Sequence, residues 1–250
     1  MQKKVLLTVS YDGTNYFGWQ KQKDSSMPTI QGELEKACTY LFKQEIECVG
    51  ASRTDRGVHA LGQRATIVLN STIPTEKIPF AIQSFLPKDI VIVEAQEVSE
   101  DFHPRFDCIQ KTYEYKIYNE SFRNPLFRNY SEFIHKKLDI LAMQEAAKNF
   151  IGTYDFKAFC AAGSSVKTTV RTIFDCNIRK EKEFIVIQVT GNGFLYNMVR
   201  ILSGTLIYVG LGKINPNEII PIIVSKDRDK AGKTVGPQGL ILKNIQYSNI

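Results

Sequence analysis

Segments with strand-like and helix-like patterns alternate along the whole chain, and this alternation limits the possible fold most strongly. In the first half, apolar β-rich runs at 5–10 and 90–98 flank a segment at 29–42 with helical periodicity, for which Thr29 is the expected N-cap. In the second half, residues 112–118 alternate aromatic and polar side chains as a half-buried strand does, and 138–151 has a helical apolar face. Residues 194–209 are predicted to be helical, and 240–247 to form a closing strand. This order predicts an α+β fold with two α+β halves around a shared, mainly antiparallel sheet and flanking helices.

The polar segment 98–110, which contains Pro104, separates the two halves, so we expect domains at 1–105 and 106–250. Charge divides at the same place. The first half holds 12 Lys and Arg against 13 Asp and Glu, whereas the second holds 20 against 13. A basic half fits a polyanionic partner, because neutralising phosphates drives most nucleic-acid affinity. We expect this half, including Lys167 and Arg171, to supply much of an RNA-binding track.

Composition and motifs exclude several other classes of protein. The five cysteines are odd in number and contain no CxxC pair, which argues against a disulfide framework or a zinc site. The chain starts in a strand-like pattern without a leader peptide, and its longest apolar run, 201–211, is too short to span a bilayer. No phosphate-loop motif is present, and the three histidines lack metal-ligand spacing. We therefore expect a reduced, cytoplasmic protein with no membrane contact and no metal.

Asp55 is the first candidate catalytic residue. It lies between Arg53 and Arg56 in a polar loop that follows a strand-like segment. Two flanking cations favour the ionised carboxylate, which suits a nucleophile or general base and not a proton donor. For a lone loop aspartate, capping of a turn is the more common role.

Three further groups of residues could carry chemistry. Tyr113 and Tyr115 share one face of a strand, where a ring can stack on a flipped-out base or simply pack in the core. Arg200 lies in apolar helical sequence and needs either a partner such as Asp55 or a route to solvent for its charged end. Leu240 opens an apolar closing strand and could pack beside a substrate ring or in the core.

Six ordered blocks of the sequence resemble the tRNA pseudouridine synthase A family. Together they span essentially the whole chain, which makes a coincidence of short motifs implausible. The blocks are Tyr11-Asp12-Gly13 with residues up to Gln22, Thr29-Ile30-Gln31-Gly32-Glu33-Leu34-Glu35, Arg53-Thr54-Asp55-x-Gly57-Val58-His59-Ala60 with Gln63, Phe102 and Arg105 with Lys111-x-Tyr113-x-Tyr115, Gly152-Thr153-Tyr154-Asp155-Phe156, and Gly193 to Arg200 with Gly239-Leu240.

The resemblance implies a homodimer that holds RNA across both subunits and uses no cofactor and no metal. It implies that specific uridines in the anticodon arm of tRNA, at tRNA positions 38 to 40, become pseudouridine. Asp55 matches the catalytic aspartate, Tyr113 the tyrosine that contacts the target base, and Arg200 the arginine paired with the aspartate. Arg53 matches the arginine that helps to hold the nucleotide flipped out.

The remaining substrate-binding candidates are Arg56, Gln63, Tyr115 and Leu240. Arg56 departs from the family pattern, in which this position is commonly small or lysine, and it could alter contacts with RNA. Pro104 departs as well, since alanine is more frequent there. These departures remove no catalytic group, but they leave the RNA target open, so the same chemistry on ribosomal or another RNA is one alternative. A non-catalytic RNA-binding protein is the other.

Overall fold

A computed structural model of the chain describes residues 2–22, 27–163 and 166–248. The chain divides into two compact units, Met1–Ile109 with Ile241–Ile250, and Gln110–Leu240. The sequence suggested a division after residue 105 with nothing returning to the first half. The difference arises because the last strand pairs in parallel with a strand of the first unit, Ile241 opposite His59.

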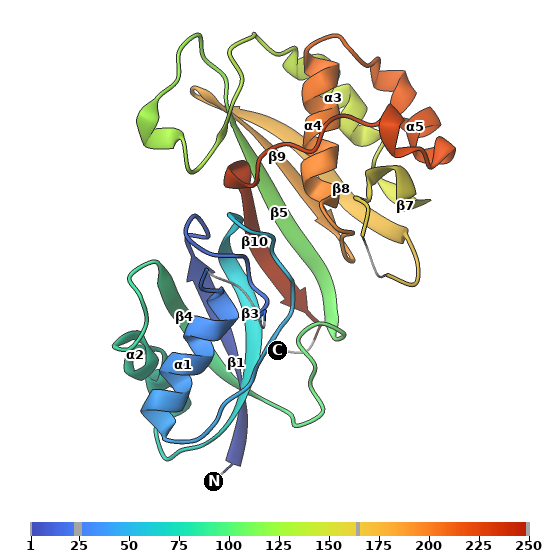
Figure 1. Ribbon diagram of the computed structural model, residues 1–250. Helices are drawn as coiled ribbons and strands as arrows, with labels where there is room; N and C mark the ends of the chain where they lie inside the picture. Colours follow the sequence, from blue (N-terminus) through green and yellow to red (C-terminus); the bar gives the residue numbers. More distant parts are fainter. Residues whose placement is uncertain (1, 23–26, 164–165, 249–250) are drawn as a thin grey trace. The chain divides into compact units, whose positions relative to one another are not determined.

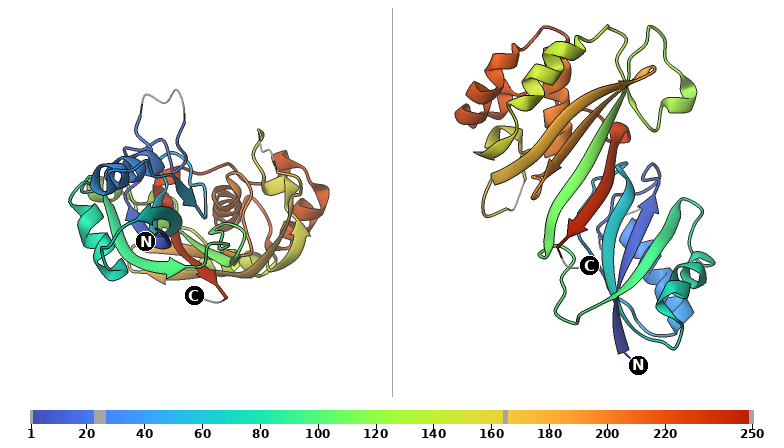
Figure 2. Two further views of the ribbon diagram at one scale, coloured as in Figure 1. Left: turned by 90° about the horizontal axis from the view of Figure 1, so that it is seen from below. Right: turned by 180° about the vertical axis from the view of Figure 1, so that it is seen from behind.

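The first unit is built on a sheet covered by helices on one face (Figures 1 and 2). Its strands follow the order β4 (Ile90–Val98), β1 (Gln2–Tyr11), β3 (His59–Asn70) and β10 (Leu240–Tyr247), and β2 (Cys48–Gly50) pairs with β3. The pairs β4–β1, β1–β3 and β2–β3 are antiparallel. The helices are α1 (Ile30–Phe42) and α2 (Ile78–Gln83), the latter preceded by the 3-10 turn Thr75–Lys77.

Helix α1 begins where the sequence predicts. Thr29 is extended, and its side chain accepts a hydrogen bond from the backbone N–H of Gly32, which satisfies one of the open donors of the first turn. Ile30 and Leu34 are fully buried against the sheet. The helix therefore has a cap, which Thr29 supplies, and an apolar face. Neither depends on the polar side chains within Ile30–Phe42.

The second unit contains the rest of the sheet strands and three helices (Figure 1). Its strands follow the order β5 (Cys108–Tyr118), β9 (Phe184–Gly191), β8 (Val170–Glu181) and β7 (Gly152–Asp155), all antiparallel, and β6 (Glu132–Phe133) pairs in parallel with β5. The helices are α3 (Ile140–Lys148), α4 (Met198–Gly210) and α5 (Ile219–Ser225). The 3-10 turns are Pro125–Phe127, Lys157–Phe159, Pro216–Glu218, Arg228–Lys230 and Pro237–Gly239.

The predicted α+β class, with mainly antiparallel strands and flanking helices, is confirmed. Helix α4 starts four residues later than predicted: it begins at Met198 and not at residue 194, because Asn197 has a left-handed backbone with φ 58° that helical residues do not adopt. The four-residue strand β7 was not predicted. No helix in the described part of the chain is long and apolar enough to cross a membrane.

Candidate active site

Asp55 lies in the loop that joins β2 to β3 in the first unit. Its side chain is half-buried, whereas Arg53 and Arg56 on either side are exposed. The loop turns back on itself, since Val58 N–H donates to the Asp55 carbonyl at 3.1 Å and Gly57 has φ 76°. In the sequence, the half-buried Asp55 is thus flanked by one exposed arginine on each side.

The segment after β1 holds this loop in place. Trp19 N–H donates to the Thr54 carbonyl at 3.1 Å, and the Tyr11 hydroxyl lies 2.7 Å from the Thr54 hydroxyl. Gly57 N–H donates to the Tyr16 carbonyl at 3.4 Å. The residues next to Asp55 in sequence are therefore fixed by backbone and side-chain bonds, which limits how far the carboxylate can move.

Two polar side chains of β3 contact the segments on either side of the site: His59 contacts the segment after β1, and Gln63 contacts the Asp55 loop. His59 is buried, and its Nδ1 accepts from Gly13 N–H at 3.1 Å and lies 3.1 Å from an Asp12 carboxylate oxygen. Gln63 is fully buried, and its amide donates to the Ser52 carbonyl at 2.6 Å and accepts from Ser52 N–H at 3.2 Å. These contacts show that Gln63 orders the start of the loop; its predicted binding of substrate stays a prediction.

Tyr113 belongs to the second unit. It lies on β5 opposite Val189 and is 6% exposed. Its ring packs edge-on against Phe194, with centroids 5.2 Å apart and an interplanar angle of 85°. Phe194 is half-buried and precedes α4. The edge-on contact fixes the orientation of the Tyr113 ring; its predicted contact with the target base stays a prediction.

Arg200 lies in the first turn of α4 and is held on two sides. Its Nη1 donates to the Asn197 side-chain oxygen at 2.7 Å, and its Nε donates to the Val235 carbonyl at 2.8 Å. The side chain is half-buried. Two hydrogen bonds to the same guanidinium fix its plane. The charged end of Arg200 is therefore held by protein groups, and the side chain does not simply extend into solvent.

Tyr115 and Leu240 are both buried. The Tyr115 hydroxyl donates to the Gly236 carbonyl at 2.8 Å, and burial, followed by the charge of Glu132, raises the pKa of this phenol. The neutral phenol therefore ties the 235–240 segment to β5. The predicted contact of these two residues with substrate stays a prediction.

The structure thus groups the predicted residues by unit. Asp55, Arg53, Arg56 and Gln63 belong to the first unit, and Tyr113, Tyr115, Arg200 and Leu240 to the second. The pairing of Asp55 with Arg200 stays a prediction.

Sequence reasoning did not single out the two residues that hold Arg200. Asn197 carried a signal that could have been used, since it is a residue type that tolerates left-handed backbone and it stands directly before an apolar helical run. Val235 carried none, because its carbonyl reaches Arg200 only through the fold. Among the described residues, no group of three or more His, Cys, Asp or Glu side chains is placed to hold a metal ion.

A carboxylate presented between two exposed arginines, in a mixed α/β chain with one basic half, is typical of an enzyme that acts on a polyanionic substrate. Comparison with known proteins identifies the family within this class of enzymes. The profile of the tRNA pseudouridine synthase family matches residues 7–107 and 146–248. This chain belongs to that family, which confirms the resemblance.

The similarity to individual relatives covers their full length. This chain is 53% identical over 248 residues to tRNA pseudouridine synthase A 2 of Clostridium tetani (strain Massachusetts / E88), covering 99% of this chain and 100% of that protein. It is 50% identical over 245 residues to tRNA pseudouridine synthase A of Caldicellulosiruptor saccharolyticus, covering 98% and 100%. A solved archaeal box H/ACA sRNP Nop10-Cbf5 complex aligns with 82% of this chain and 42% of that one at 11% identity and a TM-score of 0.35, a likeness too weak to inform the fold.

Proposed function

We propose that this chain is an isomerase that converts specific uridines of tRNA into pseudouridine, that the target lies in the anticodon arm, and that Asp55 is its catalytic carboxylate. Membership of the tRNA pseudouridine synthase family supports the reaction and the RNA class. The observation that carries the role of Asp55 is its presentation on a loop whose neighbours are fixed by Trp19 and Tyr11, between two exposed arginines.

The reaction needs a carboxylate and no redox partner. Uridine loses its C1′–N1 bond, the base rotates, and a C1′–C5 bond forms while the proton on C5 is lost and N1 gains one. A stacked base cannot rotate, so the nucleotide must first be flipped out. Cleavage of the glycosidic bond develops positive charge on the sugar, which a nearby carboxylate stabilises. Asp55 can do this by attacking C1′ or C6 or by removing a sugar proton.

The other residues have supporting roles in this proposal. Tyr113 contacts the target base, and Arg200 pairs with Asp55 and keeps it ionised and oriented. Arg53 holds the nucleotide in its flipped position, and Arg56 adds a second exposed cation for the RNA backbone. Because Gln63, Tyr115 and Leu240 are buried, they serve the substrate by setting the positions of the surfaces around it. Function as a cytoplasmic homodimer without cofactor or metal completes the proposal.

Replacement of Asp55 by asparagine tests the chemistry and the target together. Asp55→Asn keeps the shape of the side chain and removes its charge, so we expect loss of activity by about a thousandfold or more. Pseudouridine is mapped on total RNA from cells that lack the gene and from the same cells complemented with wild type or Asp55→Asn. Asp101→Asn, the same change at an exposed position of the first unit, is the matched control and should rescue fully.

Each outcome has a defined meaning. Loss of pseudouridine from tRNA anticodon arms, rescued by wild type and Asp101→Asn alone, supports the proposal. Loss confined to ribosomal RNA keeps the chemistry and overturns the target. Full rescue by Asp55→Asn overturns the catalytic role and favours an RNA-binding protein.

A further inference from the structure

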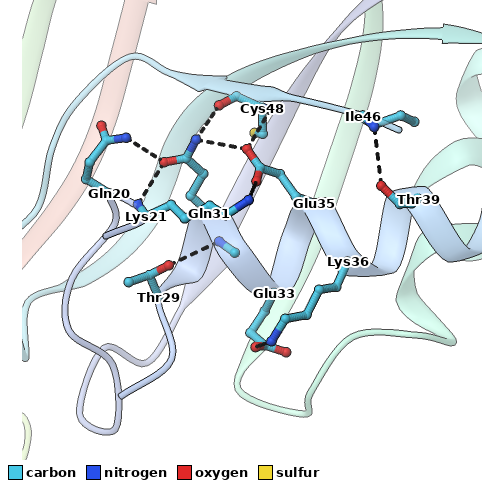
Figure 3. A network of polar contacts seen from close by, with 11 residues as sticks. Gln20, Lys21, Thr29, Gln31, Glu33, Glu35, Lys36, Thr39, Ile46 and Cys48 are labelled. Carbon is cyan, nitrogen blue, oxygen red and sulfur yellow. Dashed lines mark hydrogen bonds and ion pairs between the residues drawn. The ribbon is translucent and has the colours of Figure 1, made fainter. Parts of the chain in front are cut away.

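We infer that Gln31 and Glu35 are positioning residues, whose polar network fixes the segment 18–21 and, through it, the loop that carries Asp55. This inference rests on the proposed catalytic role of Asp55. The network lies on one face of α1 (Figure 3). Neither residue was a candidate from the sequence.

The side-chain amide of Gln31 makes four hydrogen bonds. Its oxygen accepts from the Gln20 side chain at 2.8 Å and from Lys21 N–H at 2.9 Å. Its nitrogen donates to a Glu35 carboxylate oxygen at 2.9 Å and to the Cys48 carbonyl at 3.0 Å (Figure 3). Both donors and both acceptor sites of the amide are used, so the orientation of Gln31 is determined and so is that of its partners.

Glu35 anchors the other end of the network. It is 8% exposed, an unusual environment for a carboxylate, yet its oxygens accept from Gln31, from Cys48 N–H at 3.1 Å and from the Lys21 ammonium at 3.0 Å. A buried carboxylate is costly unless its lone pairs are satisfied. Burial, and then the neighbouring Glu35, raise the pKa of the Cys38 thiol to about 12, so that thiol stays protonated and adds no competing charge.

The backbone carries the constraint from α1 to the Asp55 loop. Ile30 N–H donates to the Gly18 carbonyl at 3.1 Å and Gln31 N–H to the Trp19 carbonyl at 3.0 Å. Trp19 in turn donates its own N–H to the Thr54 carbonyl. Trp19 is 1% exposed and leaves no space over Gly50 of β2, where an added Cβ would lie 2.2 Å from the indole nitrogen. The path Cys48, Glu35, Gln31, Trp19, Thr54 therefore ends one residue from Asp55.

The helix α1 does not need this polar network in order to be stable. The helix is capped by Thr29 and packed through Ile30 and Leu34, which need no polar partner. A polar network in which every member is satisfied fixes the orientation of the groups within it. Catalysis is sensitive to such restriction, since a displacement of about 1 Å in a reacting group can slow a reaction about a hundredfold.

The test compares two changes on the same helix. Gln31→Met is close in volume and removes all four bonds, whereas Thr39→Val removes the single bond from Ile46 N–H to the Thr39 hydroxyl, at the far end of α1 (Figure 3). In single-turnover reactions with saturating enzyme and tRNA transcript, we expect Gln31→Met to slow the reaction about tenfold or more and to change the Kd for tRNA less than about threefold. Thr39→Val should react within about twofold of wild type.

Trp19 supplies an independent readout because it is the one tryptophan in the sequence. Gln31→Met should shift its emission to the red and increase its quenching by acrylamide, and Thr39→Val should change neither. Gln31→Glu is a second variant, since it keeps the length of the side chain and places a carboxylate against Glu35. Its rate relative to wild type should recover as pH is lowered from about 8 to about 6, because paired carboxyls share a proton that restores one donor.

Two failures are distinguishable in the same assay. Equal rates for Gln31→Met and Thr39→Val, or an unshifted Trp19 spectrum in Gln31→Met, overturn the positioning role while Asp55→Asn remains inactive. Full activity of Asp55→Asn overturns the proposed function itself.

Discussion

At the residue scale, the Asp55 loop depends on glycines that let other backbone segments approach it. A Cβ added to Gly13 would lie 2.0 Å from the Val58 carbonyl oxygen, and one added to Gly18 would lie 2.5 Å from the Thr54 carbonyl oxygen. Real Cβ atoms do not approach so closely, so the backbone on one side would have to move. Close packing against the loop thus explains why glycine stands at positions 13 and 18.

Substitution of Gly18 should damage both stability and activity. Its φ of 88° already costs an alanine about 1–2 kcal/mol, and the contact with Thr54 adds about 1–3 kcal/mol. Gly212→Ala is the matched control, because Gly212 has φ 69° and, apart from its chain neighbours, no heavy atom lies within 4 Å of the added Cβ. Thermal unfolding followed by circular dichroism should show the larger loss for Gly18→Ala, and only that variant should lose activity. Similar losses in both would mean that strain alone matters.

A single ion pair gives a prediction for acid pH. Hydrogen bonds from Lys226, at 2.7 Å, and from the Thr169 hydroxyl lower the pKa of Asp155. A carboxyl whose pKa is lowered by folding stabilises the folded chain at pH values above its pKa in the unfolded chain, which is about 3.9. This contribution is lost as pH falls through its pKa in the folded chain. Thermal unfolding should therefore show Asp155→Asn less stable than wild type at neutral pH, with the gap closing below about pH 4. A gap that is constant with pH would contradict the assignment.

At the element scale, the sequence predicts those features that local chemistry determines. The Thr29 cap, β4 at 90–98 and β10 at 240–247 agree with expectation because periodicity and turn residues mark their ends. The predicted start of α4 was wrong, because Asn197 adopts a left-handed backbone and its side chain accepts a hydrogen bond from Arg200. Likewise, the Asp55 loop could be identified, but the Gln31 network and the Val235 carbonyl could not, since they depend on residues that only the fold brings together.

Helix α4 and the segment 231–235 form one tightly packed element. An added Cβ at Gly204 would lie 1.9 Å from the Lys233 carbonyl oxygen, and Gly232 N–H donates to the Thr205 hydroxyl at 2.8 Å. This packing sets the place of the Val235 carbonyl and hence of Arg200.

Gly204→Ala should push this segment away and lower the catalytic rate about tenfold through Arg200, with a loss of about 1–3 kcal/mol in stability. Ser203→Ala is the neighbouring control, since the Ser203 hydroxyl is buried and has no hydrogen-bond partner among the described residues. That variant should keep wild-type activity and be as stable as wild type or slightly more so. Normal turnover by Gly204→Ala would show that the packing does not govern Arg200.

At the scale of the whole molecule, charge is distributed unevenly. Residues 106–250 carry a net charge of +7 and residues 1–105 a net charge of −1. Because binding releases counterions from the phosphates, the affinity for nucleic acid falls as salt concentration rises. The slope of log K against log salt is proportional to the number of phosphate contacts. Lys167 is exposed, and Arg171 at the start of β8 is half-buried, with its Nη1 donating to the Thr168 carbonyl at 3.0 Å. Both lie in the basic part of the sequence, where we expect RNA phosphates to bind.

Reversal of these two charges should therefore weaken tRNA binding more than an equal change elsewhere. For Lys167→Glu with Arg171→Glu, we expect the slope of log K against log salt to fall by about 1.4–1.8 and the Kd at low salt to rise about tenfold or more. The control reverses Lys36 and Lys43, two exposed lysines of the first unit, and changes the net charge equally. If net charge alone attracted tRNA, both double variants would weaken binding alike in filter-binding titrations. A loss restricted to the Lys167 and Arg171 variant, with single-turnover rates at saturating enzyme unchanged, would place the phosphate contacts in the basic half and separate RNA binding from the chemistry of Asp55.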